Sequence, residues 1–582
     1  MRKGRPQGNI AAVSATTGAS LAASASKRFS NSTVSYLSHQ SSAVDSKSYQ
    51  THGGRSYAVG PDDVLYYGKD GAEPDDYLHN PDGKKDRNAF VFCSGRGFAN
   101  MTTMFLLLLA LLALFAGYPI ISHFTGLKES KMGGFNLGGS NGSGQVPELT
   151  GLFKMIDDDT PTAAKTWTNP IDGSSYHLVF SDEFNQEGRT FWPGDDPFWE
   201  AVDLWYGVTG DLEWYSPEAV NTTDGYLQIT MTEDATHNLN FRSGMVQSWN
   251  KLCFQGGYLE FAAILPGSPN AAGYWPGLWT MGNLGRPGYP GSTDGMWPYS
   301  YDSCDSGILP NQTNVEGTGP PLVLNPTNGK RHLSYLPGMR TSACTCEGED
   351  HPGPNVNVGR SSPELDVLEA QTAGGVGEAS QSLQTAPYDE SYQWKNGSGY
   401  ITIYDEETSK LNSYTGGVYQ EAVSCLSNIP ADSYELADAP RAVTYGVQYS
   451  PDWTGTGQGS VTWFIDGKAT WTVQASAIGP DVQMDIGQRL IPVEPMAIIM
   501  NLGMSNGFQT IRWPSITFPA RLRVDYARLY QQDGQPDRIS CDPPDHPTAD
   551  YIARHPELYL NRNLTVFPRD TYSWPKNKLT GC

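Results

Sequence analysis

The stretch SSPELDVLEAQ, Ser361–Gln371, sets three acids into an otherwise apolar run. In a regular β-strand, side chains two residues apart share a face, so Glu364 and Asp366 point the same way. Glu369 would then face the apolar side, where an unpaired carboxylate is costly to bury. One extra residue at Val367 and Leu368, a β-bulge, restores the parity. The spacing therefore predicts a bulged strand with all three carboxylates on one concave sheet face.

The chain around this strand is also β-rich. From Tyr176 to Gln531, short runs of β-branched and aromatic residues alternate with Gly, Pro, Asn and Asp, as in YHLVFSD, GYLQITMT, AVTYGVQYS and SVTWFIDG. Such runs predict an antiparallel sandwich or barrel, because long helical periodicity is scarce. A nucleotide-binding α/β body is disfavoured.

Residues 282–362 interrupt this pattern with Gly, Pro, Asn and Cys. A loop of this length inside a compact domain is usually functional or disordered. The nearby cysteines Cys253, Cys304, Cys344 and Cys346 favour an ordered, disulfide-stapled insertion. Because it ends directly at the acidic strand, we expect it to shape the rim of the site.

The N-terminal region has a different composition. Residues 1–100 are rich in Ser, Gly, Asn and Asp and poor in large apolar residues, which predicts a disordered tail. The whole chain of 582 residues has a formal net charge of −23, and the acidic excess lies after this tail. An acidic body repels phosphates and so argues against a nucleic-acid partner, whereas a neutral polysaccharide raises no such objection.

An apolar run, MFLLLLALLALFAGYPII, occupies Met104–Ile121. It approaches the roughly 20 residues that a helix needs to cross a membrane, so we predict a transmembrane signal-anchor helix over residues 101–122. A buried core helix is the alternative. Four basic residues, Lys84, Lys85, Arg87 and Arg96, precede the span, and Lys128 and Lys131 follow it. This bias predicts a cytosolic N-terminus and a lumenal or extracellular body, in a type II secretory-pathway membrane protein.

Sequons and cysteines agree with that orientation. Five Asn-X-Ser/Thr sequons follow the span, at Asn141, Asn221, Asn311, Asn396 and Asn563. Seven cysteines also follow it and are expected to form disulfides, with one thiol left free or bridged to another chain. Their pairing stays open. The CTC motif, Cys344–Cys346, has a metal site as its alternative, but no Cys/His cluster completes one.

Three acids on one face suit glycoside chemistry. A retaining glycosidase needs a carboxylate nucleophile and an acid/base carboxyl about 5 to 5.5 Å apart. Asp366 between them would hydrogen-bond the nucleophile and separate the two Glu pKa values. The alternative is a solvated edge strand with incidental acids. Tryptophans favour the site: sugar rings stack on indoles, and we expect this of Trp275 and Trp279 and, with lower rank, of Trp297, Trp214, Trp249 and Trp513.

At this point the chain resembles a known family. VFSDEFN, DLEWYSPEAVNTTDGYLQIT, GGYLEFAAILPGSPNAAGYWPGLWTMGN, PELDVLEA and RVDYARLYQ, in that order, are similar to motifs of glycoside hydrolase family 16. The resemblance covers residues 175 to 532. It implies an all-β jelly-roll sandwich of the concanavalin-like kind that acts on β-glucans.

A closer resemblance rests on MWPYSYDSCD, SACTCEGEDHPGP and SQSLQTAPYD together with the membrane span. These resemble the fungal β-1,6-glucan synthesis-associated membrane proteins, which are needed to build the cell wall. The resemblance implies Glu364 as nucleophile, Asp366 as its assisting acid and Glu369 as acid/base. Soluble β-glucanases of the group commonly have a His shortly after this strand, whereas this chain has Gln381 and Gln384, expected to contact substrate. Their presence favours transfer over hydrolysis.

The sequence features are compatible with three functions. The first is a membrane-anchored glycosidase or transglycosylase acting on β-glucan or a glucosylated precursor. The second is a non-catalytic glucan-binding scaffold in the same pathway. The third takes Asp157–Asp159 as the metal site of a nucleotide-sugar transferase, against the simpler interpretation of an acidic stem. No cofactor or metal is expected, and no loop has a compelling calcium pattern. The linkage, the acceptor and the oligomeric state stay open.

The predicted organisation has five parts. They are a cytosolic tail (1–100), the span (101–122), a flexible lumenal stem (123–170), the sandwich (171–532) with its insertion (282–362), and a C-terminal lumenal tail (533–582) that packs on the sandwich.

Overall fold

The computed structural model describes residues 95–125, 154–327 and 332–582. These residues form two separate units, a helical segment and a β-rich body. The predicted tail up to residue 94, residues 126–153 of the predicted stem and the sequon at Asn141 lie outside the described residues.

The helical unit carries the apolar run. It consists of α2 (Gly95–Leu112), a π-helical turn η5 (Ala113–Gly117) and α3 (Tyr118–Thr125). Within it, Gly97–Ile121 is long and apolar enough to cross a membrane, and its most apolar window is 0% buried in the structure. A helix satisfies its own backbone hydrogen bonds, so such a segment is stable in hydrocarbon. The predicted span, 101–122, overlaps this window.

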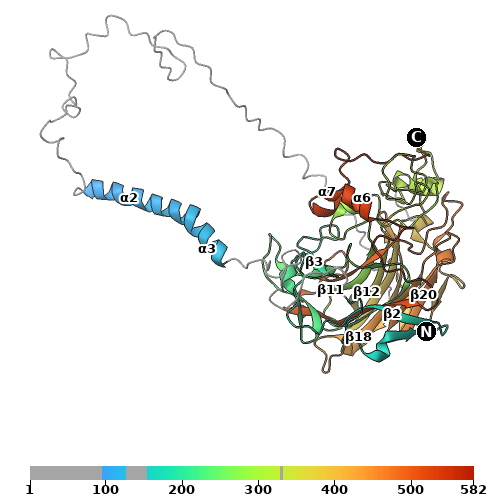
Figure 1. Ribbon diagram of the computed structural model, residues 1–582, viewed down its shortest axis with the longest axis horizontal. Coiled ribbons are helices and arrows are strands. Elements are labelled where there is room, and N and C mark those ends of the chain that lie inside the picture. Colours follow the sequence, from blue (N-terminus) through green and yellow to red (C-terminus); the bar gives the residue numbers. More distant parts are fainter. Residues whose placement is uncertain (1–94, 126–153, 328–331) are drawn as a thin grey trace, which may run out of the picture. The chain divides into compact units, whose positions relative to one another are not determined.

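The body is a sandwich of two antiparallel sheets (Figure 1). We name each sheet after one strand. The β12 sheet has the order β15-β17-β13-β12-β11-β21-β8-β3, with β16 beside β17 and β9 beside β21. Its strands are β3 (Glu200–Ala201), β8 (Met245–Gln247), β9 (Cys253–Phe254), β11 (Trp275–Gly282), β12 (Glu364–Ala373), β13 (Val376–Thr385), β15 (Ser409–Leu411), β16 (Gly416–Gly417), β17 (Gln420–Ile429) and β21 (Met496–Gly503).

The β22 sheet has the order β1-β2-β22-β10-β18-β19-β20-β14, and β6 joins β22 to β5. Its strands are β1 (Thr166–Thr168), β2 (Ser175–Asp182), β5 (Val220–Thr223), β6 (Tyr226–Met231), β10 (Gly257–Ile264), β14 (Ile401–Ile403), β18 (Val443–Ser450), β19 (Ser460–Ile465), β20 (Lys468–Gln474) and β22 (Ala520–Gln532). A separate parallel pair joins β4 (Glu213–Tyr215) and β7 (Phe241–Ser243). The predicted all-β sandwich is confirmed.

The core lies between the two sheets. It takes the inward side chains of each strand, such as Leu365 and Ala370 from β12 and Val461 and Trp463 from β19, all at most 4% exposed. Trp463 stacks on Trp471 of β20 with ring centroids 4.5 Å apart. Burial of apolar surface stabilises the fold by roughly 25 cal/mol per Å². The core therefore holds the inner face of β12 and leaves its other face free for polar residues.

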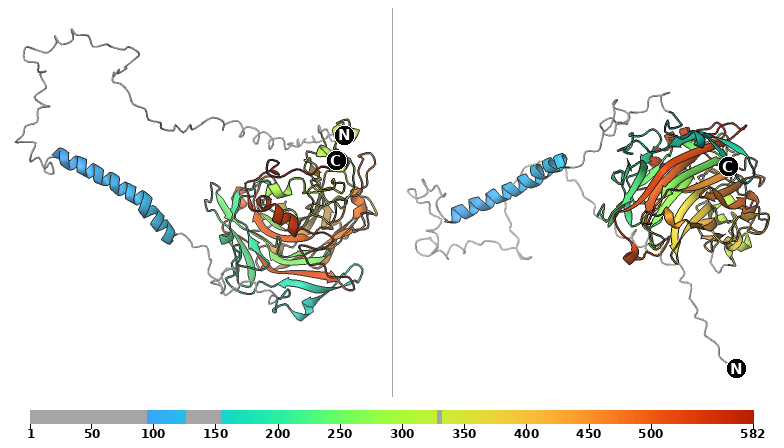
Figure 2. Two further views of the ribbon diagram at one scale, coloured as in Figure 1. Left: turned by 45° about the horizontal axis from the view of Figure 1, so that its top comes forward. Right: turned by 90° about the horizontal axis from the view of Figure 1, so that it is seen from below.

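Short helices connect the strands. They are η6 (Thr162–Lys165), η7 (Pro217–Ala219), α4 (Pro290–Thr293), η8 (Ser306–Ile308), η9 (Pro310–Gln312), α5 (Pro321–Leu324), η10 (Glu390–Tyr392), η11 (Ala431–Ser433), η12 (Ala475–Ile478), η13 (Trp513–Ser515), α6 (Ala549–Arg554) and α7 (Pro556–Leu560). The C-terminal helices α6 and α7, red in Figure 1 and Figure 2, pack through Tyr551 and Leu558 on Leu284 and Met296 of the insertion.

Disulfides tie these peripheral segments to the sandwich. The pairs are Cys304–Cys344 within the insertion, Cys253–Cys541 and Cys346–Cys582. Among the cysteines of the described ranges, Cys425 alone stays free, and it is buried. The expectation of disulfides with one thiol left over is confirmed, and Cys344 and Cys346 serve as disulfide partners.

The described end of the predicted stem belongs to the body. Residues 154–170 include β1, which pairs with β2, and Trp167 stacks on Tyr258 of β10 with centroids 3.8 Å apart. Thr160 is 5% exposed. The prediction of a flexible stem up to residue 170 is therefore corrected for this segment, because its one large aromatic side chain is held in a stacked contact.

Candidate active site

The bulge predicted for the acidic strand is present. In the β12–β13 pairing the register shifts between Asp366 and Glu369, and in the β11–β12 pairing it shifts between Leu278 and Trp279. Glu364 lies opposite Gln384 of β13, Asp366 opposite Ser382, and Glu369 opposite Ser380. Because residues directly opposite in a sheet point to the same face, the shift places all three acids on the face away from the core.

Asp366 is the most enclosed of the three acids, with 1% of its surface exposed. Its Oδ2 accepts hydrogen bonds from Ser382 Oγ at 2.7 Å and Gln384 Nε2 at 3.0 Å. On the core side, Trp463 Nε1 donates to the backbone carbonyl of Asp366 at 2.7 Å. The strand is thus pinned from the opposite sheet at the central acid.

Each glutamate receives an indole N–H from a different segment. Trp297 of the insertion donates to Glu364 Oε2 at 2.7 Å, and Trp275 of β11 donates to Glu369 Oε1 at 3.0 Å. Trp275 also stacks on Phe508, with centroids 4.4 Å apart and planes 5° from parallel. The insertion therefore reaches the acids, as the sequence predicts for the rim of the site.

A glycine makes room beside Glu369. Gly277 of β11 lies opposite Glu369, and a Cβ atom on it would lie 2.6 Å from Asn501 Oδ1 of β21. That separation is below van der Waals contact. The side-chain amide of Asn501 therefore occupies the space that a side chain at residue 277 would need.

Burial and mutual repulsion shift the three carboxyls toward their neutral forms. Burial raises the pKa of Asp366 to about 6. It also raises the pKa of Glu364 well above its usual range, with the charges of Asp366 and Glu369 adding to the rise. The pKa of Glu369 is raised in the same way by burial and by the charge of Asp366. Such mutual shifts are typical of acid/base carboxyls in glycosidases.

Trp279 of β11 lies opposite Asp366 of β12, on the same face of the sheet. It is 9% exposed, packs with Met281 and Ile499, and its Nε1 donates to Asn501 Oδ1 at 2.8 Å. Asn501 Nδ2 in turn donates to the Tyr215 hydroxyl at 3.0 Å. Trp279 is therefore held mostly under the surface, whereas Trp275 and Trp297 are half-buried at the acids.

Behind Tyr215 lies a second pair of acids that the sequence analysis did not single out. The Tyr215 hydroxyl donates to Asp211 Oδ2 at 3.0 Å, and the Met504 amide donates to Glu213 Oε1 at 3.2 Å. Burial raises the pKa of Asp211 to about 6 and that of Glu213 well above its usual range. The alternation of Asp211 and Glu213 in DLEWYS was the signal that could have revealed them.

The structure separates the two predicted glutamines. Gln384 lies beside Asp366 on the face of the β12 sheet that carries Glu364, Asp366 and Glu369, which we call the acid face. Gln381, three residues earlier in β13, has the opposite parity, is 0% exposed and accepts a hydrogen bond from Thr470 Oγ1 of β20 at 2.8 Å. Gln381 is therefore a core residue that links the sheets, and its expected contact with substrate is corrected. Ser382 holds the position next to Asp366 that strand parity would have indicated.

Other predicted sites lie apart from the acids. The sequon residues Asn221, Asn311, Asn396 and Asn563 are all exposed. In the Asp157–Asp159 stretch, Asp157 accepts from the amides of Asp159 and Glu183, and Asp158 pairs with Lys154 at 2.6 Å. Asp157–Asp159 is therefore a turn that is hydrogen-bonded to the residue that follows β2. In the described ranges no group of three or more His, Cys, Asp or Glu side chains is arranged to hold a metal ion.

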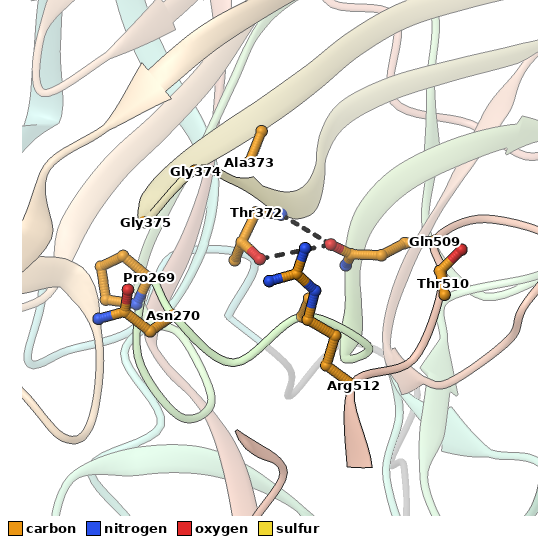
Figure 3. A pocket seen from close by; sticks show the side chains of 10 residues that line it. Pro269, Asn270, Thr372, Ala373, Gly374, Gly375, Gln509, Thr510 and Arg512 are labelled. Carbon is orange, nitrogen blue, oxygen red and sulfur yellow. Dashed lines mark hydrogen bonds between the residues drawn. The ribbon is translucent and has the colours of Figure 1, made fainter. Parts of the chain in front are cut away.

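A hollow of about 390 Å³ lies at the β12–β13 turn (Figure 3). Gln509 Oε1 accepts from the amide of Thr372 at 3.0 Å and from its hydroxyl at 3.4 Å. Figure 3 shows Arg512 close to this contact and Asn270 across the hollow from it. The three acids are not among its lining residues, so it is distinct from the acid site.

Comparisons with known proteins place the chain among glucan-related proteins. A profile described as "Beta-glucan synthesis-associated protein SKN1/KRE6/Sbg1" matches residues 66–582. The beta-glucan synthesis-associated protein KRE6 of Saccharomyces cerevisiae is 44% identical over 524 residues, which cover 88% of this chain and 69% of that protein. SKN1 of Candida albicans is 42% identical over 523 residues, covering 88% and 67%.

Two solved structures show a more distant likeness. The endo-beta-1,3-glucanase from Pyrococcus furiosus shares 16% identity over 64% of this chain and 99% of its own, with a TM-score of 0.34. SCLam, a non-specific endo-beta-1,3(4)-glucanase from family GH16, shares 17% identity over 63% and 94%, with a TM-score of 0.35.

Proposed function

Because the chain belongs to the beta-glucan synthesis-associated SKN1/KRE6/Sbg1 family, we propose that it is a retaining glycosidase or transglycosylase that acts on β-glucan during cell-wall synthesis. The observation that carries this proposal is the bulge in β12, which brings Glu364, Asp366 and Glu369 to one face. The tryptophans Trp275 and Trp297 flank the two glutamates.

The roles follow from position. Glu364 attacks the anomeric carbon of a glucosyl unit, and a covalent glycosyl-ester forms as the glycosidic C–O bond breaks. Glu369 gives its proton to the leaving oxygen. In the second half, Glu369 takes the proton from an incoming hydroxyl, whose oxygen attacks the anomeric carbon and releases Glu364. Asp366, held by Ser382 and Gln384, lies beside Glu364, and its protonated form would donate a hydrogen bond to the attacking carboxylate.

The wider setting is also proposed. The helix of the first unit would anchor the chain in a secretory-pathway membrane, with the disulfide-bonded body on the lumenal or extracellular side. Sequons Asn221, Asn311, Asn396 and Asn563 would then carry glycans, since all are exposed. The substrate would be β-glucan or a glucosylated precursor in the assembly of cell-wall β-1,6-glucan, with a sugar hydroxyl as acceptor.

The test is covalent trapping. We expect a 2-fluoro-β-gluco-oligosaccharyl fluoride of β-1,3 or β-1,6 linkage to add one glycosyl unit to Glu364 of the full-length protein, detected by mass spectrometry. Glu364→Gln should abolish the adduct. Glu369→Gln should slow transfer by about 10²- to 10⁴-fold, because it removes general acid/base catalysis. Both changes are nearly isosteric, and each replaces a buried carboxyl whose pKa is raised, so the melting temperature should not fall below that of the native protein.

A non-catalytic glucan-binding scaffold is the second candidate. The observation that favours it is the burial of Glu364, which raises its pKa and so stabilises the neutral form, a hydrogen-bonding group rather than a nucleophile. This candidate predicts oligosaccharide binding by the native protein without any covalent adduct. Adduct formation on Glu364 would exclude it.

A further inference from the structure

Three exposed tyrosines lie in the insertion and in the loops on either side of β16, beside β17 of the β12 sheet. Tyr414 and Tyr419 are each 55% exposed and Tyr335 is 44% exposed. Tyr335 and Tyr419 meet edge to face, with centroids 6.2 Å apart, and the Tyr335 amide donates to the carbonyl of Val418 at 2.7 Å. We call these three residues the tyrosine row. The insertion supplies Tyr335, the turn between β16 and β17 supplies Tyr419, and the loop between β15 and β16 supplies Tyr414.

The row begins next to the acids. Gln420 Nε2 donates to the Tyr414 hydroxyl at 3.2 Å, and Asn412 Oδ1 accepts from the Tyr414 amide at 3.0 Å. Asn412 Nδ2 donates to Ser424 Oγ of β17 at 3.2 Å, and Ser424 lies opposite Ser382. This path leads across β17 and β13 to Asp366, which accepts from Ser382. The charge of Glu369 contributes to a raised pKa of Tyr414, after burial as the main cause.

The surface between the tyrosine row and the acids is formed mainly by β13 and β17. Ser382 of β13 faces Ser424 of β17, and Gln384 faces Ala422, so small side chains dominate this stretch. Gln384 is 9% exposed and donates to Asp366, while its Oε1 finds no hydrogen-bond donor among the described residues. A buried acceptor without a partner is costly, and a sugar hydroxyl would satisfy it.

The two flanks of Glu369 differ. Toward β11, its carboxyl is closed off by Trp275, whose N–H donates to it and whose ring is stacked on Phe508. Toward β13, it faces the small side chain of Ser380. The sugar whose oxygen exchanges a proton with Glu369 must lie on an open flank. On the Ser380 side, Ser380 Oγ lies 3.4 Å from Ser424 Oγ, which accepts from Asn412, the partner of the Tyr414 amide.

We propose that the tyrosine row is a glucan-binding platform that holds the acceptor chain, with Tyr414 nearest the reacting sugar and Tyr419 and Tyr335 further along. The apolar faces of glucose rings stack on such phenol rings, and their hydroxyls meet polar neighbours such as Gln384 and Gln420. This inference rests on the proposed function, because it assigns Glu369 as the acid/base. It adds the residues that hold the acceptor, a β-linked glucan chain, and the direction of that chain across β13 and β17.

The experiment uses the full-length protein and gluco-oligosaccharides of two and four units as acceptors. Tyr414→Ala should raise the half-saturating acceptor concentration about tenfold, the loss expected for roughly 1.4 kcal/mol of stacking. Tyr414→Phe, which keeps the ring, should stay within about threefold of the native value. The rate of glycosyl trapping at Glu364 should not change in either variant, because the trap fills only the donor side.

A second arm tests the outer part of the row. Tyr419→Ala and Tyr335→Ala should remove the advantage of the four-unit acceptor over the two-unit acceptor and leave the shorter one unaffected. Tyr404→Ala is the matched control, since Tyr404 is 40% exposed and follows β14 of the other sheet. It should behave as the native protein does in every assay.

The outcomes separate the two claims. Unchanged acceptor dependence in Tyr414→Ala, with trapping intact, overturns the platform and leaves the proposed function standing. If the native protein traps no sugar, the proposed function fails, and the platform is then judged by calorimetric titration of the four-unit oligosaccharide. Equal affinities of the native and Tyr414→Ala proteins would overturn it, and weaker binding by the variant would support it as a glucan-binding surface.

Discussion

At the scale of single residues, the body contains two groups of buried acids. Glu364, Asp366 and Glu369 lie on the acid face, and Asp211 and Glu213 lie behind Tyr215. Glu213 is 0% exposed, and burial together with the charge of the adjacent Asp211 carboxyl raises its pKa well above the usual range. A carboxyl in such surroundings favours its protonated form. The pair behind Tyr215 therefore makes the stability of the body depend on pH.

The sign of this dependence follows from the raised pKa of Glu213. A carboxyl with a raised folded-state pKa stabilises the fold fully below its unfolded pKa of about 4.3, and the contribution is lost as pH rises through the folded pKa. Gln does not titrate and keeps the acceptor for the Met504 amide. We therefore expect Glu213→Gln to gain stability relative to the native protein as pH rises above about 4.3, by up to about 1.4 kcal/mol per pH unit.

Urea denaturation at a series of pH values measures this gain. Glu316→Gln, at an exposed acid of the insertion, is the control and should track the native protein throughout. A constant difference between Glu213→Gln and the native protein across the range would contradict the assignment of a buried, protonated carboxyl at this position.

At the scale of elements, β12 is organised by its bulge. Val367 and Leu368 are both 0% exposed and both belong to the core, so two successive residues share the inner face. The acids before and after them keep the outer face because the extra residue is absorbed there. The insertion adds a second element to the site, since Trp297 donates to Glu364 from a position 67 residues away in sequence.

Changing the length of β12 by one residue tests this arrangement. Deleting Val367 removes the bulge but leaves Glu369 four residues from Glu364, on the same face of a regular strand. We expect this variant to lose about 1 to 3 kcal/mol of stability, because a core side chain is gone, and still to form the glycosyl adduct.

The matched variant inserts one Ala between Val367 and Leu368. If the bulge is retained, the extra residue turns Glu369 toward the core, so we expect this variant to slow glycosyl transfer at least as much as Glu369→Gln does. For both variants, mass spectrometry measures the adduct and the rate of glycosyl transfer, and thermal melting measures stability. A rate of glycosyl transfer equal to that of the native protein in the insertion variant would show that strand parity does not place Glu369.

At the scale of the whole molecule, disulfides connect segments that are far apart in sequence. Cys346–Cys582 joins the insertion to the last residue across 236 positions, and Cys253–Cys541 joins β9 to the C-terminal segment across 288. The C-terminal helices also pack on Met296, the residue next to Trp297. The C-terminal segment therefore supports the part of the insertion that reaches Glu364.

Removing disulfides with different loop lengths tests this support. Cys346→Ala with Cys582→Ala opens a separation of 236 residues, and Cys304→Ala with Cys344→Ala opens one of 40. Loop-closure entropy predicts that the first pair stabilises the protein by about 1.5 kcal/mol more than the second. Urea denaturation of both double variants measures the difference, and Cys425→Ala controls for loss of the free thiol. Equal losses would mean that native-state contacts, rather than chain entropy, set the contribution of these bridges.

The sequence by itself determined the features that depend on short-range geometry. Alternation of side chains along a strand placed Glu364 and Asp366 on one face, and the misplaced parity of Glu369 predicted the bulge. Composition alone identified the apolar span and the β-rich body. The same parity rule, applied to Gln381 and Gln384, would have separated them, because residues three apart in a strand face opposite ways.

Only the tertiary structure decided which distant residues meet. The contacts of Trp297 with Glu364 and of Trp275 with Glu369, the pairing of the cysteines, the burial of Asp211 and Glu213 and the meeting of Tyr335 with Tyr419 all join segments separated by loops or by other strands. Backbone geometry fixes the direction of a side chain within one strand, whereas the register between strands and the path of the insertion depend on the packing of the whole core. That packing sums many weak contacts, and no single stretch of the sequence carries it.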